Sequence, residues 1–481
     1  MNIASVIDGH ESATTALIEE GQTMTYGELG AQVTAMRAGL AALGVGKGSR
    51  VLVIGENESD FVVALMAAVG LGAQCAPIRA SNPLPEVERK VATVDPNVVV
   101  LCTTAKWLDG SLESIGRQVC AVQETVAAGA KLAPAALVEC DDGDTAFLLL
   151  TSGVTSHAKV AVLSHGNLDW VQQAVVGGGD GLNCEDVALG LLPLTHIFGL
   201  NVVLFATLRG GGSVVLQQRF DALRSLELIE QHGVTTISGA PGMWHRWVNT
   251  EVEGNPLSGV RRASSGAAAL PIETFNQVRD RFGIEIGEGY GLTETSPVLT
   301  WSRGVKPRAG SVGRPLEGVE IVIVDPDGTP TDPGDVGEIV VRSPGVFQGY
   351  MDAPEETAQV LTDDGWFWTG DMGVFDADGF LYLVDRIKDI VIVSGFNVYP
   401  AEVESVLLEH PEVRGAIVVG AADPNTGEAV VAHVSGQVDI DELDQFCRER
   451  LSRYKCPREF HVVDELPMSA TGKPLRRALR S

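Results

Sequence analysis

The sequence lacks the features of several common protein classes. Its seven cysteines, at positions 75, 102, 120, 140, 184, 447 and 456, are an odd number, widely scattered and without CxxC spacing. This pattern indicates neither a disulfide framework nor a zinc site, and all seven can be read as buried small apolar residues in a reducing cytosol. The N-terminus has no basic region followed by an apolar core, so we predict no secretory signal and expect a cytoplasmic protein.

Basic residues are scarce beside acidic ones, since 35 Lys and Arg against 63 Asp and Glu give a formal net charge of -28. This excess argues against a nucleic-acid partner and against a purely electrostatic membrane anchor, because repulsion must be overcome before counterions can be released. The most membrane-like window, residues 61–78, is broken by glycine and glutamine and has a proline near its end. It predicts a buried helix followed by a strand, and we expect no integral membrane segment.

Short β-rich runs alternate with helix-length segments in the first half of the 481-residue chain, at 51–57, 97–102, 146–150 and 213–217. This alternation predicts an α/β fold with parallel sheets covered by helices. From about residue 310, short strands separated by PDG, PGD and DADG turns predict a smaller, antiparallel β-rich subdomain. A strand–helix–strand–helix series then predicts a small α+β unit. We therefore expect an N-terminal domain over 1–384 and a C-terminal domain over 385–481.

A hydroxyl-rich loop follows one of these predicted strands. The stretch TSGVTSHAK, at 151–159, offers hydroxyls, backbone N–H groups and one lysine to an anion. It is not the Walker pattern, because Ala158 precedes Lys159 and Val160 follows it. Taken alone, the loop is better explained as a polar turn that leaves a buried strand than as a phosphate site.

Six further motifs follow in order: PLTHIFGL (193–200), SSGAAALP (264–271), EGYGLTET (288–295), GWFWTGD (365–371), DRIKDIVIVSGFNVYPAEVE (385–404) and LPMSATGKPLRRAL (466–479). Together with the loop they resemble the adenylate-forming superfamily, which includes acyl-CoA synthetases, firefly-type luciferases and the adenylation domains of peptide synthetases. The resemblance covers nearly the whole chain. It implies activation of a carboxylate by ATP, which requires phosphate charge to be neutralised and the attacking oxygen to be held in line.

The resemblance assigns the β- and γ-phosphates of ATP to the loop residues Thr151, Ser152, Gly153, Thr155 and Lys159. The usual loop is close to Thr-Ser-Gly-Thr-Thr-Gly-x-Pro-Lys-Gly, whereas this chain has Val154, Ser156, Ala158 and Val160 at four of those places. The loss of a hydroxyl at 154 removes a phosphate donor, and the loss of glycine at 156 narrows the allowed backbone conformations. We expect ATP use to be slowed but not abolished.

The motif EGYGLTET sets a hydroxyl beside a carboxylate after a tight glycine turn, which suits joint contact with the α-phosphate and magnesium. The resemblance makes Thr293 the phosphate ligand, Glu294 the Mg²⁺ ligand and Tyr290 the adenine-stacking ring. A turn that caps a helix is the alternative. Further nucleotide contacts implied by the resemblance are Glu288, Gly289 and Gly291 around Tyr290, Gly266, Ala267 and Ala268 along the adenine, and Asp371 and Arg386 at the ribose hydroxyls.

The remaining motifs concern the acyl group and the thiol. Lys473 matches the adenylation lysine, whose long cationic side chain reaches the carboxylate and the α-phosphate together. Asp385 matches the hinge of a mobile C-terminal domain, and Ser394, Gly395 and Phe396 match the segment that lines the thiol channel. His196 matches the edge of the acyl pocket, although a lone histidine is more often structural. Apolar residues near Phe198, Trp244 and Trp247 indicate a hydrophobic pocket.

The resemblance thus implies an acyl-CoA synthetase that uses ATP, Mg²⁺ and coenzyme A and releases AMP and pyrophosphate. We expect a hydrophobic carboxylic acid as its substrate, first of all a fatty acid, with aryl acids left open. Transfer to the phosphopantetheine of a carrier protein also stays open, as does a homodimer. The altered loop further motivates a weakly active or inactive homologue that binds nucleotide or acyl ligands. Retention of Glu294, Asp371, Arg386 and Lys473 opposes that last alternative.

Overall fold

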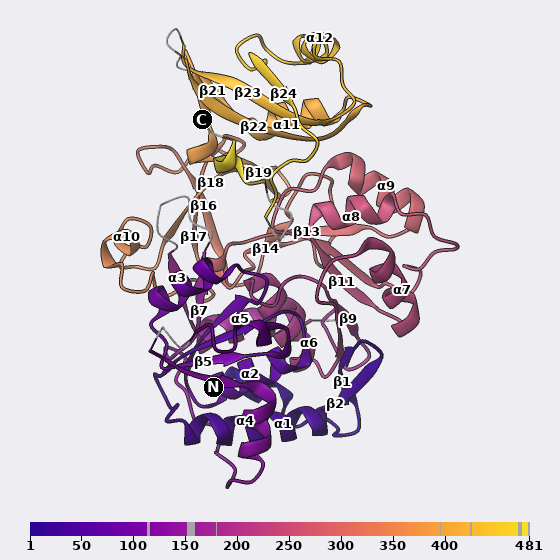
Figure 1. The fold of residues 1–481 in the computed structure, drawn as a ribbon. Helices are drawn as coiled ribbons and strands as arrows, with labels where there is room; N and C mark the ends of the chain where they lie inside the picture. The colour runs from indigo at the N-terminus through magenta and orange to yellow at the C-terminus, as the bar shows by residue number, and fades with distance from the viewer. Residues whose placement is uncertain are drawn as a thin grey trace.

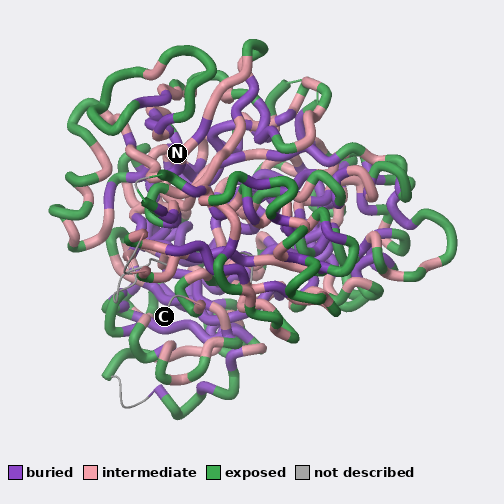
Figure 2. Tube along the Cα trace, turned by 90° about the horizontal axis from the view of Figure 1, so that it is seen from above, coloured by how far each residue is buried: buried purple, intermediate pink, exposed green. Residues whose placement is uncertain are grey.

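The fold consists of β-sheets with helices packed on their faces, as a computed structural model describes it (Figure 1). The description covers residues 1–112, 116–151, 159–178, 180–394, 396–423, 426–469 and 474–479. Buried backbone runs through the interior, and exposed backbone lies mostly in loops at the rim (Figure 2). The arrangement confirms the predicted α/β class, with a large N-terminal part of parallel sheets and helices and a smaller C-terminal part.

The first sheet has the order β6–β5–β3–β4–β7–β8, and only β8 runs antiparallel to its neighbour. Its strands are β3 (Arg50–Gly55), β4 (Gln74–Arg79), β5 (Val98–Leu101), β6 (Gln118–Ala121), β7 (Thr145–Leu150) and β8 (Val160–Ser164). Val51 and Val53 face the main core, while Leu52 and Ile54 face a second core beneath α3 (Leu84–Val94). Because both faces are covered, the strands read as continuous apolar runs.

The second sheet carries the candidate site and has nine strands in the order β15–β14–β13–β12–β11–β9–β10–β1–β2. Its strands are β1 (Thr15–Glu19), β2 (Gln22–Thr25), β9 (Val187–Gly190), β10 (Ser213–Leu216), β11 (Thr236–Gly239), β12 (Arg262–Ser265), β13 (Ile286–Tyr290), β14 (Thr300–Trp301) and β15 (Arg314–Pro315). Strands β1 and β9 to β13 are parallel. The motifs at 264–271 and 288–295 therefore leave the sheet at one edge, where ligands of α/β sheets usually bind.

Antiparallel pairing dominates from β16 onward, as the turn pattern predicts. The third sheet contains β16 (Glu320–Val324), β17 (Gly337–Arg342), β18 (Phe367–Phe375) and β19 (Leu381–Arg386). The C-terminal sheet contains β20 (Val391–Val393), β21 (Phe396–Val398), β22 (Val413–Asp423), β23 (Gly427–Gly436) and β24 (Glu459–Val462). This last sheet lies at the top of Figure 1 with α11 (Pro400–Leu408) and α12 (Ile440–Arg450).

Local sequence explains where the helices begin. Thr25 and Glu28 form a capping box at α1, and Ser164 and Asn167 form one at α5, so orphan N–H groups of each first turn are satisfied. Proline occupies the first turn of α3, α8, α10 and α11, where its missing N–H costs nothing.

The remaining helices are α1 (Tyr26–Ala42), α2 (Ser59–Gly70), α4 (Val122–Gly129), α5 (His165–Val176), α6 (Ala206–Arg209), α7 (Ala222–His232), α8 (Pro241–Val248), α9 (Ile272–Phe282) and α10 (Pro354–Ala358).

The window at 61–78 is a buried helix followed by a strand, as predicted. Helix α2 is buried at every residue from Phe61 to Gly70, and β4 follows it. Among the described residues no helix combines the length and the apolar character that a membrane crossing requires. The domain boundary at Asp385 remains a prediction.

The prediction that all seven cysteines are buried is wrong for Cys184, which is exposed. Cys75, Cys102, Cys140 and Cys447 are buried, whereas Cys120 and Cys456 are intermediate. Cys184 differs because it lies in the loop between α5 and β9, which follows the surface.

Candidate active site

Three residues predicted to contact the nucleotide meet around one carboxylate. The Tyr290 hydroxyl, at the end of β13, donates to Oδ2 of Asp371 over 2.8 Å. Nε of Arg386 lies 2.9 Å from Oδ1 of the same carboxylate. Asp371 and Arg386 are directly opposite each other on β18 and β19, so the sheet register brings them together. Both oxygens of the buried Asp371 therefore have partners from the chain itself.

Burial and the neighbouring charge of Asp371 raise the pKa of Tyr290 well above its ordinary value. Tyr290 is consequently a neutral hydrogen-bond donor at physiological pH. Its ring is buried with a relative exposure of 8%. The sequence predicted Tyr290, Asp371 and Arg386 as nucleotide contacts. No local pattern predicted the hydrogen bond between Tyr290 and Asp371.

A second cluster surrounds the predicted metal ligand. The Tyr350 hydroxyl donates to Oε1 of Glu294 over 2.8 Å, and Nζ of Lys159 lies 4.6 Å from the centroid of the Tyr350 ring. Tyr350 thus joins the predicted phosphate lysine to the predicted metal ligand. Sequence reasoning missed Tyr350, because it lies 56 residues from Glu294 and belongs to none of the motifs.

Backbone pairing explains why Tyr350 reaches both partners. The Met351 N–H donates to the carbonyl of Val160 over 2.8 Å, which fixes Tyr350 beside the start of β8. On the other side, the Phe347 N–H donates to the carbonyl of Glu294 over 2.8 Å. The Phe347 and Tyr350 rings also pack edge to face with centroids 4.9 Å apart. The segment from Phe347 to Met351 is therefore anchored at both ends.

The ends of the candidate phosphate loop are held together. The Thr151 N–H and hydroxyl both lie within hydrogen-bond distance of the Lys159 carbonyl, at 2.8 and 3.2 Å. Strands β7 and β8 pair as a hairpin on either side, so Lys159 lies opposite Thr151 at the base of the loop. Ser152, Gly153 and Thr155, with the departures Val154, Ser156 and Ala158, lie outside the described residues. The fourth departure, Val160, is buried at the first position of β8.

The predicted adenine segment follows β12 directly. The Gly266 N–H donates to the carbonyl of Gly239 over 3.2 Å. A Cβ added at Gly266 would lie 2.9 Å from Cε1 of Phe198, so glycine allows the Phe198 ring to approach. Ala267 has a φ of 70°, a left-handed conformation that costs free energy for a residue with a Cβ. Ala268 is half-buried beside it.

The backbone of the motif at 288–295 is also closely packed against neighbouring residues. A Cβ at Gly291 would lie 1.6 Å from the carbonyl oxygen of Pro297, so only glycine fits there. Gly289 pairs with Trp301 on β14. Burial raises the pKa of Glu288 to about 7, although the Leu270 N–H donates to its Oε2 over 3.0 Å. Thr293 begins a short 3-10 turn, η5 (Thr293–Thr295), and its role as a phosphate ligand remains a prediction.

His196 lies two residues before a π-helix, η4 (Phe198–Phe205). The Phe198 N–H donates to Nδ1 of His196 over 3.3 Å, which holds the half-buried imidazole against the Phe198 backbone. The expected wall of the acyl pocket at Phe198 is therefore close to the adenine segment. Trp244 and Trp247, also expected near the pocket, are instead fully buried and pack edge to face with centroids 4.9 Å apart.

The predicted hinge residue is tied into the C-terminal part. Asp385 accepts the N–H of Ala401 at Oδ2 over 2.8 Å and the N–H of Arg386 at Oδ1 over 2.7 Å. Burial raises the pKa of its carboxyl. Ser394 has a φ of 53°, and Phe396 is 57% exposed with its ring 4.9 Å from that of Tyr454. Gly395 and Lys473 lie outside the described residues.

A cavity of about 420 Å³ lies on one face of the nine-stranded sheet, within the range of roughly 300–1,000 Å³ that small-molecule sites span. Ser238, Ser264 and Gly287 form its floor, and Val202 and Thr207 belong to the helical wall. The Phe198 ring packs against an apolar cluster that contains Val202. The Phe198 ring therefore lies between this apolar cluster and Gly266.

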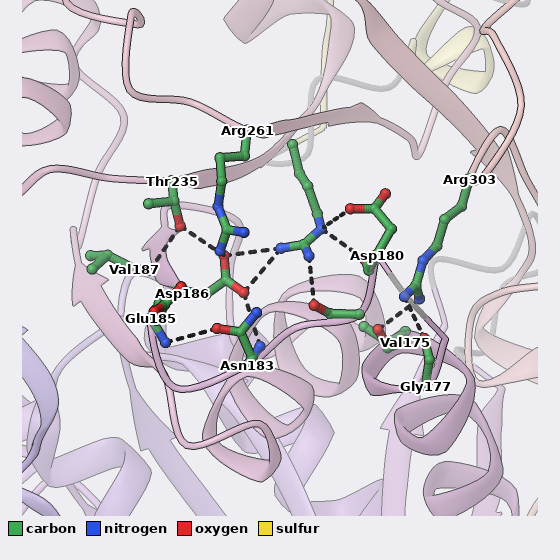
Figure 3. A network of polar contacts seen from close by, with 12 residues as sticks. Val175, Gly177, Asp180, Asn183, Glu185, Asp186, Val187, Thr235, Arg261 and Arg303 are labelled. Carbon is green, nitrogen blue, oxygen red and sulfur yellow. Dashed lines mark hydrogen bonds and ion pairs between the residues drawn. The ribbon is translucent and has the colours of Figure 1, made fainter.

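Charged residues fix one end of this cavity (Figure 3). Asp186 has no exposed side-chain surface, and its carboxylate binds Nη2 of Arg261 at 2.6 Å and Nη1 of Arg262 at 2.9 Å. Arg303 donates to the carbonyls of Ala174 and Val175 at the end of α5. These bonds hold the loop between α5 and β9, which follows the cavity wall.

The fold and this site define a nucleotide-binding enzyme. The chain belongs to the AMP-binding enzyme family, because residues 6–351 match its family model and residues 402–473 match the model of the AMP-binding enzyme C-terminal domain. The resemblance stated from the motifs is thereby confirmed.

Individual relatives are similar over most of the chain. A feruloyl-CoA synthase from Amycolatopsis sp is 36% identical over 97% of this chain and 95% of its own length. The 4-coumarate--CoA ligase 5 of Oryza sativa is 33% identical over 96% of this chain and 90% of its own length. A long-chain-fatty-acid--CoA ligase from Bacillus subtilis is 38% identical over 70% of this chain and 61% of its own length.

Solved structures have the same fold. The o-succinylbenzoate CoA synthetase of Bacillus subtilis, in complex with its acyl-adenylate intermediate, has a TM-score of 0.88 and 32% identity over 99% of this chain and 97% of its own. The anthranilate CoA ligase AuaEII in complex with anthranoyl-AMP has a TM-score of 0.91 and 25% identity over 100% of this chain and 96% of its own.

Proposed function

We propose that this chain is an ATP-dependent, AMP-forming acid–CoA ligase whose acid is aromatic. One observation carries the proposal: the Asp371 cluster, the Glu294 cluster and the cavity all lie on or beside β12 and β13. An enzyme that joins a nucleotide to an acid needs both ligands at one sheet edge. The relatives named as CoA ligases and the structures named as acyl-adenylate complexes support this reading.

The first half-reaction would join the acid to the nucleotide. A carboxylate oxygen attacks the α-phosphorus of ATP, and the bond from that phosphorus to pyrophosphate breaks. Asp371 and Arg386 would orient the ribose, and Lys159 would offset phosphate charge. Lys473 would stabilise the attacking carboxylate, as its motif implies. The product is an acyl-adenylate with pyrophosphate.

The second half-reaction would release the activated acid as a thioester. The sulfur of coenzyme A attacks the acyl carbonyl carbon, the carbon–oxygen bond to AMP breaks, and the thiol proton passes to solvent. No nucleophilic cysteine of the chain is needed. The exposed ring of Phe396 and the hinge at Asp385 belong to this step by their motifs.

Magnesium fits the residues present. No group of three or more His, Cys, Asp and Glu side chains that could hold a metal occurs within the described ranges. Mg²⁺ commonly binds one or two carboxylates together with substrate phosphates. Glu294 would be that carboxylate, and a carboxylate has acceptor capacity beyond its bond to Tyr350. When bound, the ion would neutralise phosphate charge.

An aromatic acid replaces the fatty acid as the proposed substrate. Feruloyl, coumarate and anthranilate appear in the names of relatives and neighbours, and these relatives match more of the chain than the fatty-acid ligase does. The floor of the cavity also carries hydroxyl groups at Ser238 and Ser264, which bond to each other over 2.9 Å.

The test is formation of acyl-CoA by the purified protein with ATP, Mg²⁺ and coenzyme A. Benzoates, cinnamates and straight-chain acids from six to sixteen carbons would be compared by mass spectrometry. We expect aryl-CoA products, together with acid-dependent exchange of labelled pyrophosphate into ATP. Products from straight-chain acids alone would contradict the aromatic substrate. The Glu294→Gln variant gives the background signal for both assays. If the unaltered protein gives no product and no exchange above that background with any acid, the result would contradict a ligase.

A further inference from the structure

A buried amide side chain connects η4 to the turn that carries the predicted metal ligand. Asn201 lies within η4 and is 1% exposed. Its Nδ2 donates to the carbonyl of Ser296 over 2.7 Å and to the carbonyl of Leu168 in α5 over 3.3 Å. Ser296 follows Glu294 by two residues. The amide of Asn201 therefore binds the turn at 292–297 and α5 at the same time.

The partners of Asn201 fix the orientation of its amide. Both backbone carbonyls can only accept, so the NH2 group must face them and Oδ1 must face Gln172. Nε2 of Gln172 donates to that oxygen over 2.9 Å, and Oε1 of Gln172 accepts from Nη1 of Arg209 over 3.3 Å. The same Nη1 lies 2.5 Å from Oδ1 of Asp169. A chain of donors thus runs from Arg209 to the Ser296 carbonyl, and neighbouring hydrogen bonds in such a chain strengthen one another.

The backbone of the turn has a conformation that a residue with a Cβ adopts only at a cost. Ser296 has a φ of 66° and is fully buried. Its Oγ has no hydrogen-bond partner among the described residues, so the hydroxyl does not hold this conformation. The bond from Asn201 to the Ser296 carbonyl is a restraint from outside the turn, and it offsets part of the strain.

Glu294 lies between two such restraints. The Phe347 N–H donates to the Glu294 carbonyl over 2.8 Å, and Asn201 holds the carbonyl two residues later. The Tyr350 hydroxyl binds the Glu294 carboxylate itself. A rotation of the backbone at Ser296 would therefore move the carboxylate away from the position that Tyr350 sets. Because a misplacement of about 1 Å can lower a rate about a hundredfold, the restraint at Ser296 concerns the reaction as well as stability.

We propose that Asn201 is a positioning residue for the first half-reaction, which holds the turn at 292–297 so that Glu294 faces the phosphates of ATP. This inference rests on the proposed function, because it takes Glu294 as the carboxylate that acts beside the phosphates. Asn201 itself would contact no substrate. Pyrophosphate has left before the second half-reaction begins, so a displaced Glu294 should impair the first half-reaction far more than the second.

The experiment measures the two half-reactions separately in the full-length protein. Asn201→Leu, which keeps a similar volume, should lower kcat/KM for ATP in pyrophosphate exchange at least about tenfold, because the Ser296 carbonyl loses its donor and the turn shifts. Transfer to coenzyme A from a supplied acyl-adenylate, made from the acid that supports exchange best, should change by less than about twofold. Calorimetry should show ATP binding weakened about tenfold with Mg²⁺ present and unchanged without it.

Asn2→Leu is the matched control for the loss of a buried amide. Asn2 is 4% exposed, and its Nδ2 donates to the carbonyls of Val69 in α2 and Val138 before β7, at 2.9 and 3.0 Å. Its melting temperature should fall as that of Asn201→Leu does, because both variants leave buried carbonyls without a donor. The ratio of exchange to transfer should stay that of the unaltered protein.

A second substitution tests whether the backbone of the turn is what Asn201 holds. Glycine adopts a positive φ without strain, so Asn201→Leu combined with Ser296→Gly should recover exchange at least about threefold over Asn201→Leu alone. If Asn201→Leu does not fold, Gln172→Leu replaces it, because this variant frees the Asn201 amide without removing a contact of the turn. It should show the same split between the half-reactions with a loss of about threefold.

The outcomes separate this inference from the proposed function. Unchanged exchange in Asn201→Leu, equal losses in both half-reactions, or a double variant no more active than Asn201→Leu would overturn the inference while leaving the ligase intact. The absence of exchange in the unaltered protein with every acid would instead overturn the proposed function.

Discussion

Tyr350 donates its phenolic hydrogen to Oε1 of Glu294 over 2.8 Å, while the ammonium of Lys159 lies 4.6 Å from the centre of its ring. One side chain therefore positions a carboxylate and a cation that the sequence places far apart. We expect Tyr350→Phe, which keeps the ring, to raise the Mg²⁺ concentration needed for half-maximal pyrophosphate exchange about tenfold, because a hydrogen bond to a charged group contributes about 1.5–3 kcal/mol. Tyr350→Leu also loses the cation–π contact and should add to the defect.

The measurement is a titration of Mg²⁺ at fixed ATP, with thermal melting as the check on folding. Tyr382→Phe is the matched control, since the Tyr382 hydroxyl contacts Asp376 at 3.3 Å on another part of β19. An unchanged Mg²⁺ requirement in Tyr350→Phe would show that Glu294 needs no positioning by this hydroxyl.

Asp371 should be required for both ATP binding and stability. Asp371→Asn removes the charge that Arg386 and Tyr290 share, so we expect KM for ATP to rise at least tenfold and the free energy of unfolding to fall by about 1–3 kcal/mol. Asp378→Asn is the control, because its pair with Arg308 is exposed and exposed ion pairs contribute little to stability. Equal behaviour of the two variants in urea melts and in ATP titrations would contradict this role.

Glu288 should make stability depend on pH. Burial raises its pKa from the ordinary 4.5 to about 7 in the folded chain. Between pH 4.5 and about 7 the folded state keeps a proton on Glu288 that the unfolded state has lost. The free energy of unfolding therefore falls as pH rises through this range, and the full loss is reached above about pH 7. We expect Glu288→Gln to remove a penalty on the order of 3 kcal/mol at pH 8 and to have little effect at pH 4.5.

Urea melts at pH 4.5 and pH 8 test this difference. The exposed Glu273, also a glutamate near the sheet edge on α9, serves as the control as Glu273→Gln. A Glu288→Gln variant that is destabilised equally at both pH values would contradict a raised pKa at Glu288.

The turn at Gly291 should tolerate no side chain. Its added Cβ would lie 1.6 Å from the Pro297 carbonyl oxygen, so Gly291→Ala must displace the backbone that carries Thr293 and Glu294. We expect loss of pyrophosphate exchange and a lower melting temperature. Gly30→Ala is the control, because a Cβ at Gly30 in α1 meets nothing within 4 Å, and alanine should stabilise that helix by up to about 1 kcal/mol. An active Gly291→Ala protein would be inconsistent with this geometry.

Thiol reagents should distinguish Cys184 from the buried cysteines. Cys184 is exposed, whereas burial raises the pKa of Cys447 to about 12 and that of Cys75 higher still. Since the thiolate is the reactive form, we expect the folded protein to be labelled first at Cys184, without loss of activity. Peptide mapping after brief treatment with iodoacetamide identifies the labelled position, and Cys184→Ser should remove the fast phase.

The sequence by itself determined the order of the motifs and the class of the fold. The alternation of apolar strands and helices sufficed to predict parallel sheets, because each strand is buried on both faces and shows this in its composition. It also named Tyr290, Asp371 and Arg386 as nucleotide contacts, since each lies in a recognisable local motif. The helix and strand at 61–78 followed from an apolar run that glycine, glutamine and proline interrupt.

Only the tertiary structure decided which side chains meet. Tyr350 joins Glu294 to Lys159 because backbone pairing with β8 and with the Glu294 carbonyl brings its segment to them, and no local pattern encodes such a contact. The same holds for Ser238, Ser264 and Gly287, which become a cavity floor through strand register. Trp244 and Trp247 looked like pocket residues but are buried in the core, since apolar composition marks burial without distinguishing a core from a ligand site.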